Sequence, residues 1–287
     1  MTLTQSLSHQ VNSAFQTARD IRRMVRLPYS TSERASLISA LRCRGDQTDL
    51  LNFHVSFLNG ATFRWTLREI FFHGDYVFTA ATDSPIILDC GANIGLATLF
   101  FKRIYPKARI SCFEADPTTA AVLKKNIDQN HLQDVTVHNL MLSSTDGERS
   151  FFIAGNLSGS GGASGTPGRL SDTREIRVKA GKLSDYIDGP IDLLKLDVEG
   201  AEFDVMADMK ISGCLSQIKR MVIEYHHKIA GQASNMAKFL TFLEDAGFEY
   251  QLAAYCDPIS QTDIFQDILI GAYRPVQINP KIWTKNS

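Results

Sequence analysis

The sequence predicts an α/β fold with a mostly parallel sheet, preceded by an N-terminal extension of helices and a β-hairpin. Two observations lead to this prediction. From residue 84 onward, short apolar runs alternate with helical segments, which is the pattern of a sheet built from βαβ units. The first apolar run, residues 86–90, leads into a glycine-containing turn and then a helix. Such a unit places a nucleotide-like ligand at the edge of a sheet.

Residues 1–83 form the predicted extension, which begins with helices. Over residues 9–26, apolar side chains recur at helical spacing and arginines fall mostly elsewhere on the turn, as in an amphipathic helix. We interpret the arginines as a solvated face, with a dimer arm or a contact to an acidic substrate as alternatives. Ser30 and Glu33 have the spacing of a capping box, which predicts a second, short helix.

A β-hairpin is expected to complete the extension. Apolar residues alternate over 53–57 and again over 63–65, and Asn59-Gly60 between them is a favoured hairpin turn. The hairpin would lead directly into the main sheet.

Residues 84–275 are predicted to form the main domain, and residues 276–287 a C-terminal tail. The last two strands, 249–255 and 267–273, are expected to pair antiparallel at one edge of the sheet. The expected parallel strands are 86–90, 109–114, 135–142, 191–197 and 220–225.

One insertion between the predicted strands is rich in glycine and serine. It runs from Gly155 to Gly168 and lies between the strand-like segments 150–153 and 175–179. This composition cannot bury a core and leaves the backbone much freedom. Two interpretations stay open: a flexible hairpin tip, or a lid that closes over a substrate.

The composition limits the classes of function. Hydrophobic residues make up 44% of the chain and charged residues 21%, as in ordinary globular proteins. The formal net charge of −1 argues against a nucleic-acid partner, which would require a basic surface. No segment has the length of a membrane span, and the N-terminus lacks a secretion signal pattern. The five cysteines lack metal-binding spacing, so we expect a cytoplasmic protein, for which a homodimer is compatible with the amphipathic N-terminal helix.

The turn after the first main strand indicates the class of ligand. Asp89 is followed by Gly91 and Gly95, a G-x-x-x-G spacing rather than the G-x-G-x-x-G of dinucleotide sites. An acid at the mouth of this turn would repel phosphate and suits the sulfonium and ammonium of S-adenosylmethionine. Glu114 ends the next strand, where a carboxylate accepts hydrogen bonds from both ribose hydroxyls. Glu114 alone would suit a nicotinamide cofactor equally well, and the glycines alone would permit close helix packing.

Candidate catalytic residues follow the later strands. Methyl transfer to a hydroxyl requires alignment and a general base. Asp197 closes the strand 191–197, and His226 follows the strand 220–225, so both are predicted to reach the acceptor. Glu199 would orient one of them or begin the next helix. Alternatively, Asp197, Glu199 and His226 would hold a divalent cation, but their spacing does not favour this over metal-free catalysis, and we assign no metal ligands.

Three blocks of this sequence resemble the FkbM family of methyltransferases. They are Ile87–Gly95, with Asp-Cys-Gly-Ala-Asn-Ile-Gly, Phe113–Pro117, and Leu194–Glu202, which contains the family's K-x-D-x-E-G-x-E pattern. Their order and separation also fit. The resemblance is firm over residues 84–227, weaker toward both sides, and absent from residues 1–50.

This resemblance implies a Rossmann-like class I methyltransferase fold that uses S-adenosylmethionine, commonly to methylate hydroxyls of sugars, glycans or natural products. It implies cofactor-loop roles for Gly91, Asn93 and Gly95, and a ribose contact for Glu114. It also places Ser143 to Asp146 near the adenine. A relative that binds the cofactor without catalysis is the alternative, and a nicotinamide-dependent oxidoreductase is a more distant one.

Overall fold

The computed structural model describes residues 28–154, 163–165, 173–227, 235–254 and 266–275. Its central sheet has seven strands in the order β11-β12-β10-β9-β3-β4-β5. The strands from β10 to β5 are mutually parallel, whereas β12 runs antiparallel to both β10 and β11. The predicted mostly parallel seven-stranded sheet with an antiparallel edge hairpin is therefore confirmed. The bounds are β3 Ile86–Cys90, β4 Arg109–Glu114, β5 Val135–Asn139, β9 Leu193–Leu196, β10 Arg220–His227, β11 Glu249–Ala254 and β12 Gln266–Tyr273.

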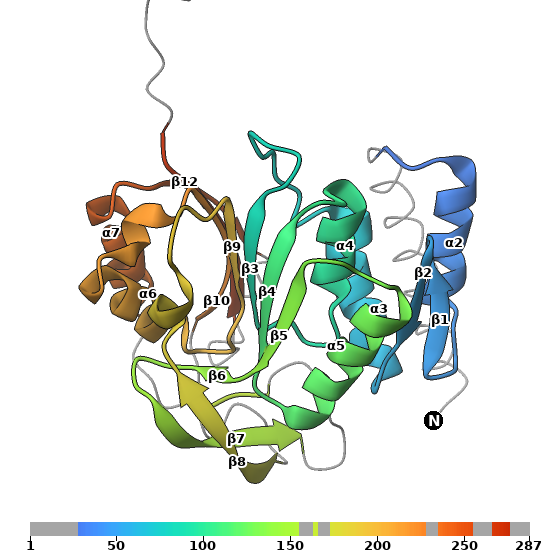
Figure 1. The fold of residues 1–287 in the computed structure, drawn as a ribbon, viewed down its shortest axis with the longest axis horizontal. Helices are drawn as coiled ribbons and strands as arrows, with labels where there is room; N and C mark the ends of the chain where they lie inside the picture. The colour runs from blue at the N-terminus through green and yellow to red at the C-terminus, as the bar shows by residue number, and fades with distance from the viewer. Residues whose placement is uncertain (1–27, 155–162, 166–172, 228–234, 255–265, 276–287) are drawn as a thin grey trace, which may run out of the picture.

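Helices cover both faces of this sheet (Figure 1). Helices α4 (Leu96–Ile104) and α5 (Pro117–Gln129) lie on one face, and α6 (Glu202–Ile211) and α7 (Met236–Asp245) lie on the other. Two short 3₁₀ helices, η2 (Leu183–Tyr186) and η3 (Cys214–Gln217), precede β9 and β10, respectively, in the chain. Each face buries its own hydrophobic core, since successive side chains of a strand point to opposite faces.

The described extension contains α2 (Thr31–Leu41), β1 (Gln47–Leu50), β2 (Phe53–Ser56), α3 (Gly60–Leu67) and the π-helix η1 (Arg68–His73). The predicted capping box is confirmed, because the Ser30 side chain accepts from the Glu33 amide and the Glu33 side chain accepts from the Ser30 amide. The helix predicted over residues 9–26, and with it the basis for a homodimer, lies outside the described residues.

The predicted hairpin is wrong in its position. The strands that pair are β1 and β2, and residues 63–65, expected as the second strand, belong to α3. Asn59 does not form the turn but caps this helix, since its Oδ1 accepts hydrogen bonds from the amides of Ala61 and Thr62. The first backbone amides of a helix have no partner within the helix, and an Asn side chain that accepts hydrogen bonds from two of them favours a helix start over a hairpin turn.

The described extension packs onto the main sheet through one continuous core. Phe71 meets Phe100 of α4 edge to face, with ring centroids 5.3 Å apart. The buried Asn126 of α5 joins the two parts, because its Nδ2 donates to the carbonyls of Ser56 and Ile94 and its Oδ1 accepts from the Ser56 amide. The domain boundaries at residues 84 and 275 stay a prediction about the organisation of the sequence.

A small second sheet lies beyond the carboxyl ends of the main strands (Figure 1). Its order is β6-β8-β7, with β6 Met141–Leu142, β7 Gly147–Ala154 and β8 Thr173–Gly181. The strand predicted over 135–142 is therefore divided at Leu140 between the two sheets. Among the described helices, none combines the length and hydropathy that a membrane span requires.

Candidate active site

The turn after β3 is shaped by close packing against the end of β9. Gly91 has a φ of +77°, and a Cβ at this position would lie 1.7 Å from the Asp197 carbonyl oxygen. The amides of Gly91 and Ala92 both donate to the Phe113 carbonyl on β4. Since only glycine fits this contact and favours this φ, Gly91 determines how closely the turn approaches the Asp197 segment.

Glu114 holds the same turn from the other side. Its Oε2 accepts from the Asn93 amide and its Oε1 from the Asp116 amide, each at 2.9 Å. Asn93 itself has a φ of +49°, and its Oδ1 accepts from the Ile94 amide. Burial raises the pKa of Glu114 to about 7, although the two amide hydrogen bonds oppose this change. A carboxylate oxygen has lone pairs beyond one amide bond, so Glu114 retains acceptor capacity for ligand hydroxyls.

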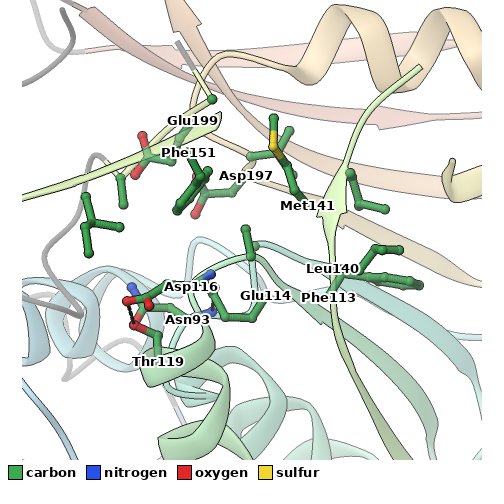
Figure 2. Close-up of a pocket in the computed structure, with 17 residues that line it drawn as sticks. Asn93, Phe113, Glu114, Asp116, Thr119, Leu140, Met141, Phe151, Asp197 and Glu199 are labelled. Atoms are coloured by element: carbon green, nitrogen blue, oxygen red, sulfur yellow. Dashed lines mark hydrogen bonds between the residues drawn. The ribbon is translucent and has the colours of Figure 1, made fainter. Parts of the chain in front are cut away.

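A first cavity, with about 730 Å³ of empty volume, opens above this turn. In the view of Figure 2, Asn93 and Glu114 lie on one side of it and Asp197 and Glu199 on the other. Much of the remaining wall is apolar and is formed by Phe113, Leu140, Met141, Leu142, Phe151 and Ile153. A mostly apolar cavity with a few carboxylates has the chemistry expected of a nucleoside site, because the apolar side chains can contact a base and the carboxylates can accept hydrogen bonds from a ribose.

Part of the glycine/serine-rich insertion reaches this cavity. Ala163 and Gly165 line it, and Ser164 forms a bridge with Phe152 of β7. The Ser164 hydroxyl also donates to the Glu199 carbonyl. The rest of Gly155–Gly168 lies outside the described residues, so both interpretations of this insertion, a hairpin tip and a lid, stay predictions.

The prediction for Asp89 is wrong in its geometry. We expected its carboxylate at the mouth of the turn, but Asp89 is fully buried and lines neither cavity described here. Alternation along β3 puts Asp89 on the same face as Ile87, beneath α4, where it accepts a hydrogen bond from Thr98. Its Oδ1 lies 3.6 Å from Nζ of Lys195.

Lys195, which the sequence analysis did not assign to the site, links the turn to Asp197. Its Nζ donates to the carbonyl oxygens of Gly91 at 2.6 Å and Cys90 at 3.3 Å, and lies 3.3 Å from Asp197 Oδ2. Burial lowers the pKa of Lys195, but the negative charges of Asp197 and Asp89 outweigh this effect and raise the pKa above its ordinary value. The ammonium therefore stays charged. A lysine inside an apolar strand requires such partners, and this was the available signal in the sequence.

Three other predicted cofactor residues also lie away from the first cavity. Gly95 begins α4 with a φ of +92°, and a Cβ there would lie 2.6 Å from Leu123 of α5, so the absence of a side chain lets these two helices pack closely. Ser143 and Asp146 follow β6 and lie beside Gly181 of β8. The chain crosses the cavity earlier than predicted, at Leu140–Leu142, because β5 ends at Asn139.

The three predicted catalytic residues come together in the structure. His226 Nε2 lies 3.0 Å from Glu199 Oε2 and 3.8 Å from Asp197 Oδ1. The ligand atoms of these three residues lie within 4.8 Å of one another, a spacing that also suits a metal ion. Asp197 and Glu199 line the cavity, whereas the His226 side chain is 1% exposed and lies behind them.

Glu202, a residue not predicted, orients His226. Glu202 Oε1 lies 2.7 Å from His226 Nδ1 and also accepts from the amides of Val198 and Gly200. Burial lowers the pKa of His226, but the carboxylates of Glu202 and Glu199 outweigh it and raise the pKa well above its ordinary value. His226 is therefore an imidazolium that holds Glu199, and we interpret it as a positioning residue.

A second cavity, with about 1160 Å³ of empty volume, adjoins the first. Four residues line both cavities: Gly91, Asn93, Asp197 and Glu199. The second cavity extends toward the N-terminal extension, which contributes Trp65, Glu69 and Tyr76. Only tertiary packing brings these residues to the sheet, so no local pattern in the sequence could have identified them.

Comparisons with known proteins identify the family of the chain. A model of the FkbM methyltransferase domain matches residues 89–250, more than half of the chain. Methyltransferase 1 of Beauveria bassiana is 27% identical over 201 residues, which cover 63% of this chain and 79% of that protein. Methyltransferase sdnD of Sordaria araneosa is 34% identical over 170 residues, which cover 48% of this chain and 66% of that protein. The 2-O-methyltransferase NoeI of Sinorhizobium fredii is 31% identical over 155 residues (48% and 63%).

Proposed function

The chain belongs to the FkbM family of methyltransferases, and we propose that it transfers a methyl group from S-adenosylmethionine to a hydroxyl of a small molecule or glycan. One observation carries this proposal: two adjoining cavities share Gly91, Asn93, Asp197 and Glu199. A transferase requires two ligand sites that meet at the reacting atoms, and the shared residues mark this meeting point.

The first cavity suits the cofactor. Glu114 would accept hydrogen bonds from the ribose hydroxyls, and the apolar walls around Phe113 and Leu140 would hold the adenine. Gly91 and Asn93 would face the cofactor at the junction with the second cavity. When bound, S-adenosylmethionine supplies a methyl group on a sulfonium, which makes that methyl electrophilic.

Asp197 is the residue best placed to act as general base. An acceptor hydroxyl loses its proton as its oxygen is methylated, and the Asp197 carboxylate at the junction would take this proton. Burial raises the pKa of Asp197 above its ordinary value, against the opposing effect of Lys195, and this makes the carboxylate a stronger base. Lys195 fixes one Asp197 oxygen, while His226 lies 3.8 Å from the other.

Oxygen as the acceptor atom is supported by two arguments. The NoeI relative is named a 2-O-methyltransferase, and a hydroxyl, unlike a neutral amine with its free lone pair, requires the base that the junction offers. A divalent cation at Asp197, Glu199 and His226 is compatible with their distances. It is not required, since Glu199 and Glu202 already bond both ring nitrogens of His226.

Substitution of Asp197 by asparagine tests this mechanism. We expect Asp197→Asn to bind S-adenosylmethionine nearly normally and to slow methyl transfer by about 10²- to 10⁴-fold, the effect of a lost general base. The measurement is incorporation of labelled methyl into a panel of hydroxylated acceptors. Wild-type turnover in the variant would remove Asp197 from the mechanism.

A further inference from the structure

The second cavity is lined by more carboxylates than its cations can offset. Lys195 is the single lysine or arginine among the described residues that line it. Lys195 is already bonded to the Gly91 carbonyl and to Asp197, and His226 behind the wall lies between Glu199 and Glu202. The lining carboxylates come from η1, β10, β12 and the turn after β9; they are Glu69, Asp197, Glu199, Glu224 and Asp267.

Two of these carboxylates, Glu69 and Glu224, form no ion pair within 4 Å with the described residues, although a ring nitrogen of His226 lies within 4.8 Å of a Glu224 oxygen. Both face further carboxylates. Burial raises the pKa of Glu69 to about 8, and the negative charges of Asp75 and Asp197 add to the rise. Burial likewise raises the pKa of Glu224 well above its ordinary value, with Asp197 and Glu69 as the next contributors. A bound cation would reverse both effects, because it favours the ionised carboxylates.

Aromatic side chains complete the wall of the second cavity. Trp65 is 65% exposed, unusually open for a tryptophan, and its side chain hydrogen-bonds Glu69. Tyr76 and Phe57 line the same cavity, but the Tyr76 ring already has Lys195 Nζ 5.7 Å from its centroid and the Phe57 ring is stacked on Phe63. The face of an aromatic ring attracts cations, and tryptophan does so most strongly. The carboxylates and the exposed Trp65 ring together therefore favour an ammonium group over a neutral or anionic one.

We propose that the second cavity binds an acceptor with a protonated amine, which faces Glu69, Glu224 and Trp65 while the hydroxyl to be methylated lies beside Asp197. This inference rests on the proposed function and specifies the chemical class of the acceptor: a hydroxylated amine such as an amino sugar. Acceptors with a phosphate or carboxylate are expected to bind more weakly, because the carboxylates of this cavity repel them.

Three hexoses of similar size and different charge test the proposal: glucosamine, glucose and glucuronate. Trp65 reports their binding through its fluorescence once Trp283, the other tryptophan of the chain, is replaced by phenylalanine. We expect glucosamine to bind at least about tenfold more tightly than glucose, the effect of one hydrogen bond to a charged group, and glucuronate to bind more weakly than glucose. Glu69→Gln and Glu224→Gln should each reduce the preference for glucosamine, whereas Glu148→Gln, on the exposed part of β7, should not.

Several outcomes would overturn the proposal. They are no response to glucosamine, equal affinity for glucosamine and glucose, tighter binding of glucuronate, or full preference retained in both glutamine variants. A saturable response to Mn²⁺ with none to glucosamine would also overturn it, in favour of a metal site. Calorimetric titration of the same samples with S-adenosylmethionine tests the proposed function separately, since a failure to bind the cofactor leaves the charge preference of the second cavity measurable.

Discussion

Replacement of Glu114 by glutamine tests the proposed cofactor cavity. Both carboxylate oxygens of Glu114 accept backbone amides, from Asn93 and Asp116. The Glu114→Gln variant keeps the size of the side chain but replaces one acceptor oxygen with a donor. The new NH₂ group of the glutamine would therefore face one of the two backbone amides, donor against donor. The variant would also lose at least one hydrogen bond from a ribose hydroxyl.

The expected loss follows from the charge of the lost acceptor. A hydrogen bond to a charged group contributes about 1.5–3 kcal/mol, so each lost bond weakens binding by about 10- to 100-fold. The dissociation constant for S-adenosylmethionine, measured by calorimetry, should rise by at least this factor. Glu148→Gln, which lies away from both cavities, is the matched control.

The same residue predicts a pH dependence of binding. Burial raises the pKa of Glu114 to about 7, so its carboxyl is largely protonated at pH 6 and ionised at pH 8. Ribose hydroxyls donate to the ionised form, hence affinity should rise with pH and fall by up to about tenfold per unit below pH 7. The Glu114→Gln variant should lack this component, which separates it from titration of the cofactor itself. Equal affinities and equal pH profiles in wild type and variant would refute the ribose assignment.

Three further substitutions test the packing that forms the site. Gly91→Ala should abolish cofactor binding, because its Cβ would lie 1.7 Å from the Asp197 carbonyl; Gly213→Ala, at a similar φ of +80° with no atom within 4 Å, should bind the cofactor normally in the same calorimetry. Lys195→Met should lower the free energy of unfolding in urea by about 3–5 kcal/mol, since it leaves Asp89 and Asp197 buried without their cation, and a loss below about 1 kcal/mol would show that the ammonium is dispensable. Asn126→Ala should cost about 2–4 kcal/mol in the same assay, because the amide and carbonyl of Ser56 lose their partner; an unchanged midpoint would mean that the extension does not stabilise the main domain.

The strand–helix order of the main domain could be predicted from the sequence because it depends on local patterns. Each of these patterns determines the structure of residues close by in the chain: the apolar runs form strands, Ser30 with Glu33 caps a helix, and the glycines after β3 form a turn. Asn59 shows where such patterns become ambiguous. Asn-Gly suits both a hairpin turn and a helix cap. In the structure Asn59 is a helix cap, because its side chain accepts hydrogen bonds from two backbone amides of α3.

The site was predictable in part for the same reason. Asp197 and Glu199 follow β9, and His226, which was expected just after the neighbouring parallel strand, lies within its carboxyl end because β10 extends to His227. Their meeting could therefore be expected from the strand order. Strand alternation could have predicted that Asp89 points beneath α4. The requirement that a buried ammonium has partners could have identified Lys195 as a residue of the site. Glu69 and Trp65 could not be found, because they reach the second cavity only through packing of the extension.

The central claim is that the first cavity binds S-adenosylmethionine, and calorimetric titration of the purified protein with this compound tests it most directly. NAD is the control, since Glu114 alone would suit either cofactor. The account predicts saturable binding of S-adenosylmethionine and none of NAD. Binding of NAD alone, or of neither compound, would contradict it.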